Sequence, residues 1–85
     1  MLSFDYTIKD ELGIHARPAG LLAKLAKTVD SEVTITKGEK TVNMTKLMAL
    51  MSLGVKCGEM ITVSVSGGDE VSSLETVKKF IEENL

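Results

Sequence analysis

The only histidine, the only arginine and the only proline of the chain lie in one short segment, residues 13–19, which reads GIHARPA. His15 carries an imidazole, which can act as a nucleophile through whichever ring nitrogen lacks a proton. Arg17 carries a planar guanidinium, whose fork of N–H donors suits a phosphate group. Pro18 is typical of the first turn of a helix, where its missing N–H is not needed. These residue types place a nucleophile and a phosphate ligand at a predicted helix start.

A helix is expected directly after these residues. The segment 20–27, GLLAKLAK, is rich in good helix formers, so we predict a helix from about 16 to 28. His15 and Arg17 then lie at its N-terminus, where unpaired backbone N–H groups and the positive end of the helix dipole can hold an anion. The segment therefore combines a reactive imidazole with an anion-binding helix end.

The composition limits the possible classes of protein. The 85 residues allow one domain, residues 1–85, and 44% hydrophobic residues suffice for a modest core. The net charge of −2 argues against a dedicated nucleic-acid binder, and no segment is apolar enough for membrane insertion. Cys57 is the only cysteine, so an internal disulfide is impossible and a cytoplasmic location is expected. Neither a metal-ligand pattern nor a P-loop is present, so no metal and no cofactor are expected.

Hydrophobic periodicity predicts four strands and three helices. The predicted strands are residues 2–8, 32–36, 41–43 and 60–66. A short second helix is expected at about 46–53, with Thr45 as its N-cap and Gly54 just after its end. The last helix follows Asp69 as its N-cap. Its core-facing stripe is predicted to comprise Val71, Leu74, Val77 and Ile81.

This element order, β-α-β-β-α-β-α, predicts an α+β fold. The expected architecture is an open-faced β-sandwich, in which three helices cover one face of a four-stranded sheet. The helix between the first two strands makes a right-handed crossover, which leaves these two strands parallel. The fourth strand can then insert between them, antiparallel to both.

The segment 13–19 resembles the active-site signature of HPr, the histidine-containing phosphocarrier family of the bacterial phosphoenolpyruvate:sugar phosphotransferase system. Two further segments are similar to the same family, residues 40–43 (KTVN) and 48–54 (MALMSLG). Length and element order agree along essentially the whole chain. The resemblance implies an antiparallel sheet in the order 1-4-2-3, which is consistent with the topology predicted above.

The resemblance also implies a function. His15 would accept a phosphoryl group on Nδ1, as a pros-phosphohistidine, from phosphorylated enzyme I and pass it to IIA domains of sugar permeases during sugar uptake. Ala16, Arg17 and Pro18, at the start of the first helix, would hold the phosphate. The chain would be a phosphocarrier on which partner enzymes act, and not itself an enzyme. A carrier must release its partners quickly, so we expect a monomer.

A partner-docking surface is implied as well, in which an apolar patch beside the histidine is ringed by basic residues that steer acidic partners. The residues that align with it are Gly20, Lys24, Lys27, Leu47, Met48 and Met51. Lys46 is a further candidate for the basic rim. The alternative interpretation is that the Leu and Met side chains belong to the core and that the lysines are only solvated charges.

Position 46 departs from many Gram-positive relatives, which carry there a serine that is a regulatory phosphorylation site. Lys46 cannot be phosphorylated by a serine kinase, so regulation by HPr kinase is predicted to be absent. Thr45 lies about 100° around the helix from that position, and the serine's role is not transferred to it. Leu12 stands where relatives usually carry Asn or Ser beside the active site.

Two alternative functions remain open. An HPr-like carrier could serve a regulatory or nitrogen-branch phosphorelay, an interpretation that the missing serine favours. A non-catalytic interaction module could instead bind a regulator through the apolar patch. The second alternative predicts that His15→Ala retains activity, whereas the phosphocarrier hypothesis predicts that this substitution abolishes all phosphate uptake.

Overall fold

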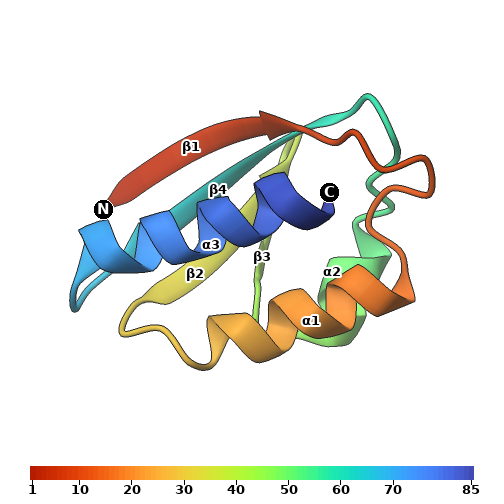
Figure 1. The fold of residues 1–85 in the computed structure, drawn as a ribbon. Helices are drawn as coiled ribbons and strands as arrows, with labels where there is room; N and C mark the ends of the chain where they lie inside the picture. The colour runs from red at the N-terminus through yellow and green to blue at the C-terminus, as the bar shows by residue number, and fades with distance from the viewer.

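The computed structural model describes all 85 residues and contains four strands and three helices. In chain order, the elements are β1 (Leu2–Thr7), α1 (Ala16–Ala26), β2 (Glu32–Lys37), β3 (Lys40–Asn43), α2 (Leu47–Ser52), β4 (Met60–Ser66) and α3 (Glu70–Asn84). The strands form one sheet in the order β1-β4-β2-β3, and each neighbouring pair is antiparallel. Figure 1 shows α1 and α3 lying across the same side of this sheet. The predicted fold class is confirmed, including the insertion of β4 between β1 and β2.

The core lies between the sheet and the helices, because one face of each central strand is apolar. In β4, Ile61, Val63 and Val65 are fully buried and alternate with the less buried Thr62 and Ser64. Burying one Val or Ile side chain contributes roughly 2 kcal/mol. A shift of the strand by one residue would turn all three apolar side chains outward, so this pattern sets the register of the sheet.

The core-facing stripe of α3 differs from the prediction in its first turn. Val71 is 60% exposed, and Ser73 is buried in its place. Ser73, Val77 and Ile81 follow at four-residue steps, whereas Val71 lies six residues from Val77 and therefore about 120° away around the helix. The hydroxyl of Ser73 is accommodated because it is hydrogen bonded to the hydroxyl of Ser31 at 2.9 Å. The prediction for Val71 was wrong.

The start of α2 differs as well. Lys46 occupies the N-cap position, and its side chain makes no capping hydrogen bond. Thr45 donates its hydroxyl to Asn43 Oδ1 at 2.7 Å and its backbone N–H to the same oxygen at 2.9 Å. Thr45 therefore belongs to the turn that follows β3, because the Asn43 side chain offers a competing local hydrogen bond. The predicted N-cap was wrong, whereas Gly54 follows the helix with φ +61°, as expected.

Two of the helices are slightly shorter than predicted. α1 ends at Ala26 and not near residue 28, where the Thr28 hydroxyl donates to the Leu25 carbonyl oxygen at 2.7 Å and closes the last turn. α2 spans Leu47–Ser52, one residue shorter at each end than expected. None of the three helices has both the length and the apolar character needed to cross a membrane.

The end of α3 reaches the loop that joins β1 to α1 (Figure 1). The carbonyl oxygen of Leu85 accepts the backbone N–H groups of Lys9 at 2.6 Å and of Asp10 at 2.8 Å. The side chain of Leu85 is buried in the core. The residue at the end of α3 is therefore hydrogen bonded to the loop that leads to His15.

Candidate functional site

His15 lies at the N-cap of α1, where the sequence placed it. Its backbone is extended, with φ −95° and ψ −175°, so the side chain projects from the helix end without entering the first turn. The imidazole makes no capping hydrogen bond, and 36% of the side chain is exposed. The ring is therefore accessible to a partner, while the His15 backbone N–H is held by the Gly13 carbonyl oxygen at 3.1 Å.

Two backbone N–H groups at the start of α1, those of Ala16 and Arg17, have no backbone hydrogen-bond partner. Pro18 has no N–H, and Ala19 is the first residue whose N–H is bonded within the helix, to the His15 carbonyl oxygen at 3.0 Å. Open N–H groups and the helix dipole together favour an anion at this end. Of the predicted phosphate-binding residues, Ala16 and Arg17 offer donors, whereas Pro18 can only line the site.

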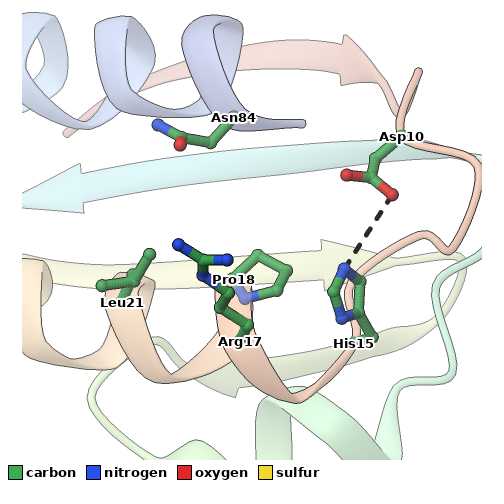
Figure 2. Close-up of a pocket in the computed structure, with 6 residues that line it drawn as sticks. All are labelled: Asp10, His15, Arg17, Pro18, Leu21 and Asn84. Atoms are coloured by element: carbon green, nitrogen blue, oxygen red, sulfur yellow. Dashed lines mark ion pairs between the residues drawn. The ribbon is translucent and has the colours of Figure 1, made fainter.

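An open pocket with a volume of about 250 Å³ lies at this helix end. Figure 2 shows the residues that line it. Its walls come from the β1–α1 loop, the first turns of α1 and the end of α3. The lining residues are Asp10, His15, Arg17, Pro18, Leu21 and Asn84. The fold thus brings the predicted nucleophile and the predicted phosphate ligand, His15 and Arg17, into one pocket.

Asp10 and Asn84 are pocket residues that the sequence analysis did not identify. Asp10 Oδ1 lies 3.9 Å from His15 Nε2, within ion-pair distance (dashed line in Figure 2), and it accepts the Leu12 N–H at 2.9 Å. Asp10 could have been predicted from the local sequence, since a turn at the intervening glycine can bring an aspartate five residues before the histidine close to the imidazole. Asn84 comes from the other end of the chain, and no local pattern marks it.

Gly13 shapes the loop that carries His15. Its φ of +67° lies in the left-handed region, which glycine adopts without strain. A Cβ at this position would collide with the Val55 carbonyl oxygen and lie 2.7 Å from Lys56 Cα. The close approach lets the Ile14 N–H donate to the Val55 oxygen at 3.0 Å. The loop before His15 is therefore tied to the segment that follows α2.

The predicted docking residues lie on α1 and α2, which pack against each other (Figure 1). The three predicted apolar residues of α2 are all exposed: Leu47, Met48 and Met51. Gly20 and Lys24 of α1, and Lys27 at its C-cap, follow at steps of four and three residues and so share one face of the helix. Leu12 and Leu21, which the sequence analysis did not assign to this surface, are also exposed. These five exposed apolar residues thus lie on both helices and on the loop beside His15.

Known proteins resemble this chain along nearly its whole length. The family model described as "PTS HPr component phosphorylation site" matches residues 2–83. The phosphocarrier protein HPr of Mycoplasma capricolum is 37% identical over 79 residues, which cover 93% of this chain and 89% of that protein.

Solved structures agree with the sequence matches. A histidine-containing phosphocarrier protein of Mycoplasma has a TM-score of 0.92 and 34% identity, with 96% of this chain and 93% of that chain covered. An HPr dimer from Thermoanaerobacter tengcongensis has a TM-score of 0.76 and 36% identity, with 92% and 90% covered. The chain therefore belongs to the HPr family, the phosphocarriers of the phosphotransferase system.

Proposed function

We propose that this chain carries a phosphoryl group on Nδ1 of His15, from phosphorylated enzyme I to IIA domains of sugar permeases in the cytoplasm. One observation carries the proposal. An accessible imidazole stands at the N-cap of α1, next to the open N–H groups of Ala16 and Arg17, in a pocket that the Arg17 side chain also lines. A phosphoryl group on that ring would meet both backbone donors and a guanidinium.

The strength of this anion site suits a carrier. A phosphoramidate on imidazole is a high-energy linkage, and a protein that stabilised it too strongly could not pass it on. A helix N-terminus contributes about 0.3–1 kcal/mol to an exposed anion, which is a moderate and reversible stabilisation. Arg17 is exposed and adds bidentate donors without enclosing the phosphate. The partner enzymes would supply the remaining positioning, and the carrier would act as a monomer that they bind in turn.

The partners would dock on the exposed apolar residues of α2, with the basic residues of α1 around them. Met48 is 76% exposed, and Met side chains adapt to different partner surfaces. Lys24, Lys27 and Lys46 are exposed. They would form a basic rim around this patch and raise the association rate with acidic partners. A surface with these properties serves a protein that must bind two unrelated enzymes in succession.

We expect no regulation of this chain by a serine kinase at position 46. Lys46 is the N-cap of α2. It stands at the position where many Gram-positive relatives are expected to carry the regulatory serine. The neighbouring Thr45 hydroxyl donates to Asn43 Oδ1 at 2.7 Å and is only partly exposed. HPr kinase with ATP is expected to leave the chain unmodified, and a stable phosphate mapped to Thr45 by mass spectrometry would contradict this expectation.

The direct test is incubation with enzyme I and labelled phosphoenolpyruvate, followed by addition of a IIA domain. We expect an acid-labile, base-stable label on His15 that moves to the IIA domain, and no label on the His15→Ala variant. No label from a competent sugar-branch enzyme I would overturn the proposal. Labelling only by a nitrogen-branch enzyme I would assign the carrier to that relay.

A further inference from the structure

We infer that Asp10 is a positioning residue for phosphoryl transfer. Its carboxylate keeps a proton on Nε2 of His15, so that Nδ1 attacks with a free electron pair and later leaves as part of a neutral imidazole. The inference rests on the proposed function, because it concerns how the same histidine gains and loses its phosphoryl group. Asp10 does not touch the phosphate in this scheme and acts only through the ring.

The distances support this role. Asp10 Oδ1 lies 3.9 Å from His15 Nε2, and Figure 2 shows the second ring nitrogen on the side of the ring away from Asp10. The separation is within ion-pair range and longer than a direct hydrogen bond. Such contacts commonly shorten when the reacting complex forms. The carboxylate therefore acts on one ring nitrogen and leaves the other free to react.

Asp10 is held in place by two backbone–backbone hydrogen bonds and by one between its side chain and a backbone N–H. Its N–H donates to the Leu85 carbonyl oxygen at 2.8 Å, and its own carbonyl oxygen accepts the Gly13 N–H at 2.9 Å. Its Oδ1 also accepts the Leu12 N–H at 2.9 Å, which orients the side chain. Because these bonds already restrict the backbone and the side chain of Asp10, little further side-chain entropy is lost when its carboxylate faces the imidazole.

The electron balance explains why the Nε2 proton matters. In the forward step, the Nδ1 electron pair forms the N–P bond while the bond between phosphorus and phosphorylated enzyme I breaks, and its electron pair stays with enzyme I. The proton stays on Nε2, so the product is a phosphorylated imidazolium. In the return step, the N–P bond breaks, the electron pair goes back to Nδ1, and the phosphoryl group passes to the partner's nucleophile. The ring then leaves as neutral imidazole. Without the Nε2 proton, it would have to leave as an imidazolate anion, which is a much poorer leaving group.

The charges around the ring are divided in a way that fits this scheme. The pocket contains two charged side chains besides His15: Asp10 from the β1–α1 loop and Arg17 from α1. α3 contributes Asn84, which is neutral. The negative group faces Nε2, and the donors for phosphate lie at the start of α1. A proton and a phosphoryl group can therefore be stabilised on the same ring at the same time.

A purely structural role for Asp10 is separable from the positioning role. Its bond to the Leu12 N–H forms a local turn that Asn or Ser can also form. Asp10→Asn and Asp10→Ser therefore remove the charge and keep the turn. Glu11→Gln is the matched control, because it removes the same charge one residue further along the loop. The Glu11 side chain is exposed and makes no hydrogen bond or ion pair.

Two measurements test the inference. ¹⁵N NMR of the unphosphorylated proteins gives the ratio of the Nε2–H to the Nδ1–H form of neutral His15, which we expect to fall at least twofold in both Asp10 variants. ³¹P NMR of the phosphorylated proteins gives the pH at which Nε2 takes up its proton. A charge about 4 Å away in a largely hydrated site changes this equilibrium about fivefold, which lowers the midpoint by about 0.7 pH unit. Glu11→Gln is expected to change neither quantity by more than about a third of these amounts.

The rate of phosphoryl loss should follow the same pattern. Above the midpoint, spontaneous hydrolysis of the phosphohistidine should slow about fivefold in both Asp10 variants and remain near the wild-type rate in Glu11→Gln. Asp10 variants that match Glu11→Gln in tautomer ratio and midpoint would overturn the inference. If the wild-type protein cannot be phosphorylated on His15, the proposed function fails, and the tautomer ratio still decides whether Asp10 positions the proton.

Discussion

A histidine that transfers phosphate needs neighbours that hold the anion and neighbours that control its ring protons. His15 has the first kind in the open N–H groups of Ala16 and Arg17, and the second in Asp10. These groups lie within one short loop and one helix turn, so their placement depends on how firmly that loop is held. One further side chain, Glu59, contributes to that support.

Glu59 links the end of β2 to the segment that follows α2, and this segment is hydrogen bonded to the loop before His15. Its Oε1 accepts the Lys56 backbone N–H at 2.7 Å and pairs with Lys37 Nζ at 3.1 Å. Lys37 also donates to the Gly54 carbonyl oxygen at 3.0 Å, just after α2. The hydrogen bond from the Lys56 N–H, followed by the contacts with Lys37, lowers the pKa of Glu59 from its ordinary value of 4.5.

This lowered pKa predicts how stability depends on pH. Because the unfolded chain binds the Glu59 proton more tightly, the stabilisation is present above about pH 4.5 and is lost as the pH falls through the lower folded-state pKa. Urea unfolding should show Glu59→Gln less stable than wild type at pH 7, with a difference that shrinks towards pH 3. Glu39→Gln, in the exposed β2–β3 turn, should show no such trend. Equal destabilisation by Glu59→Gln at both pH values would contradict the prediction.

The β1–α1 loop and α1 contain two glycines that differ in whether their position has room for a side chain. Gly13 has positive φ and no room for a side chain, since a Cβ would meet the backbone of Val55 and Lys56. Gly20 lies within α1, and a Cβ there would have open space on every side. The first glycine is needed for the loop conformation, and the second lowers the stability of the helix.

Substitution of each glycine by alanine should therefore have opposite effects. Gly13→Ala is expected to destabilise the fold by about 3 kcal/mol, from left-handed backbone strain and the forced movement of the Val55 segment. Gly20→Ala is expected to stabilise it by about 1 kcal/mol, because alanine favours the helix. Urea unfolding at neutral pH measures both free energies. A Gly13→Ala protein as stable as wild type would show that the loop does not need the close contact between Gly13 and the Val55 backbone.

The topology of the whole molecule places α2, which carries the apolar residues of the proposed docking surface, against α1, whose N-cap is His15. Within this fold, α1 and α2 are in contact, and Met48 of α2 is exposed. Met60 is similarly exposed, at 56%, but it starts β4 on the opposite face from the buried Ile61. Met48 and Met60 are thus a pair of strongly exposed methionines, of which Met48 lies on the proposed docking surface and Met60 does not.

This pair gives a test of partner binding. Met48→Asp should weaken the complex with enzyme I by at least about tenfold, equivalent to about 1.4 kcal/mol, because a charge replaces a central apolar contact. Met60→Asp should leave the affinity within about twofold. Isothermal titration calorimetry measures both values. Equal weakening by the two variants would show that a general property, such as net charge, governs binding and not the α2 surface.

The sequence by itself determined the strands and the start of α1 directly after His15. These features rest on local physics: alternation along a strand, helix propensity and the preference of proline for the first turn of a helix. The HPr resemblance added the sheet order, which the structure bears out.

Tertiary structure alone decided which side chains meet at the ring. Asn84 enters the pocket because α3 crosses the sheet, and Leu85 fixes Asp10 because the end of that helix lies beside the β1–α1 loop. Val71 is exposed because contacts with the sheet along the whole of α3 decide which side of this helix is buried. Residue spacing alone predicts that side only approximately. Contacts between residues distant in the chain leave no periodic trace in the sequence, so only the fold could show that the carboxylate of Asp10 faces Nε2 of His15.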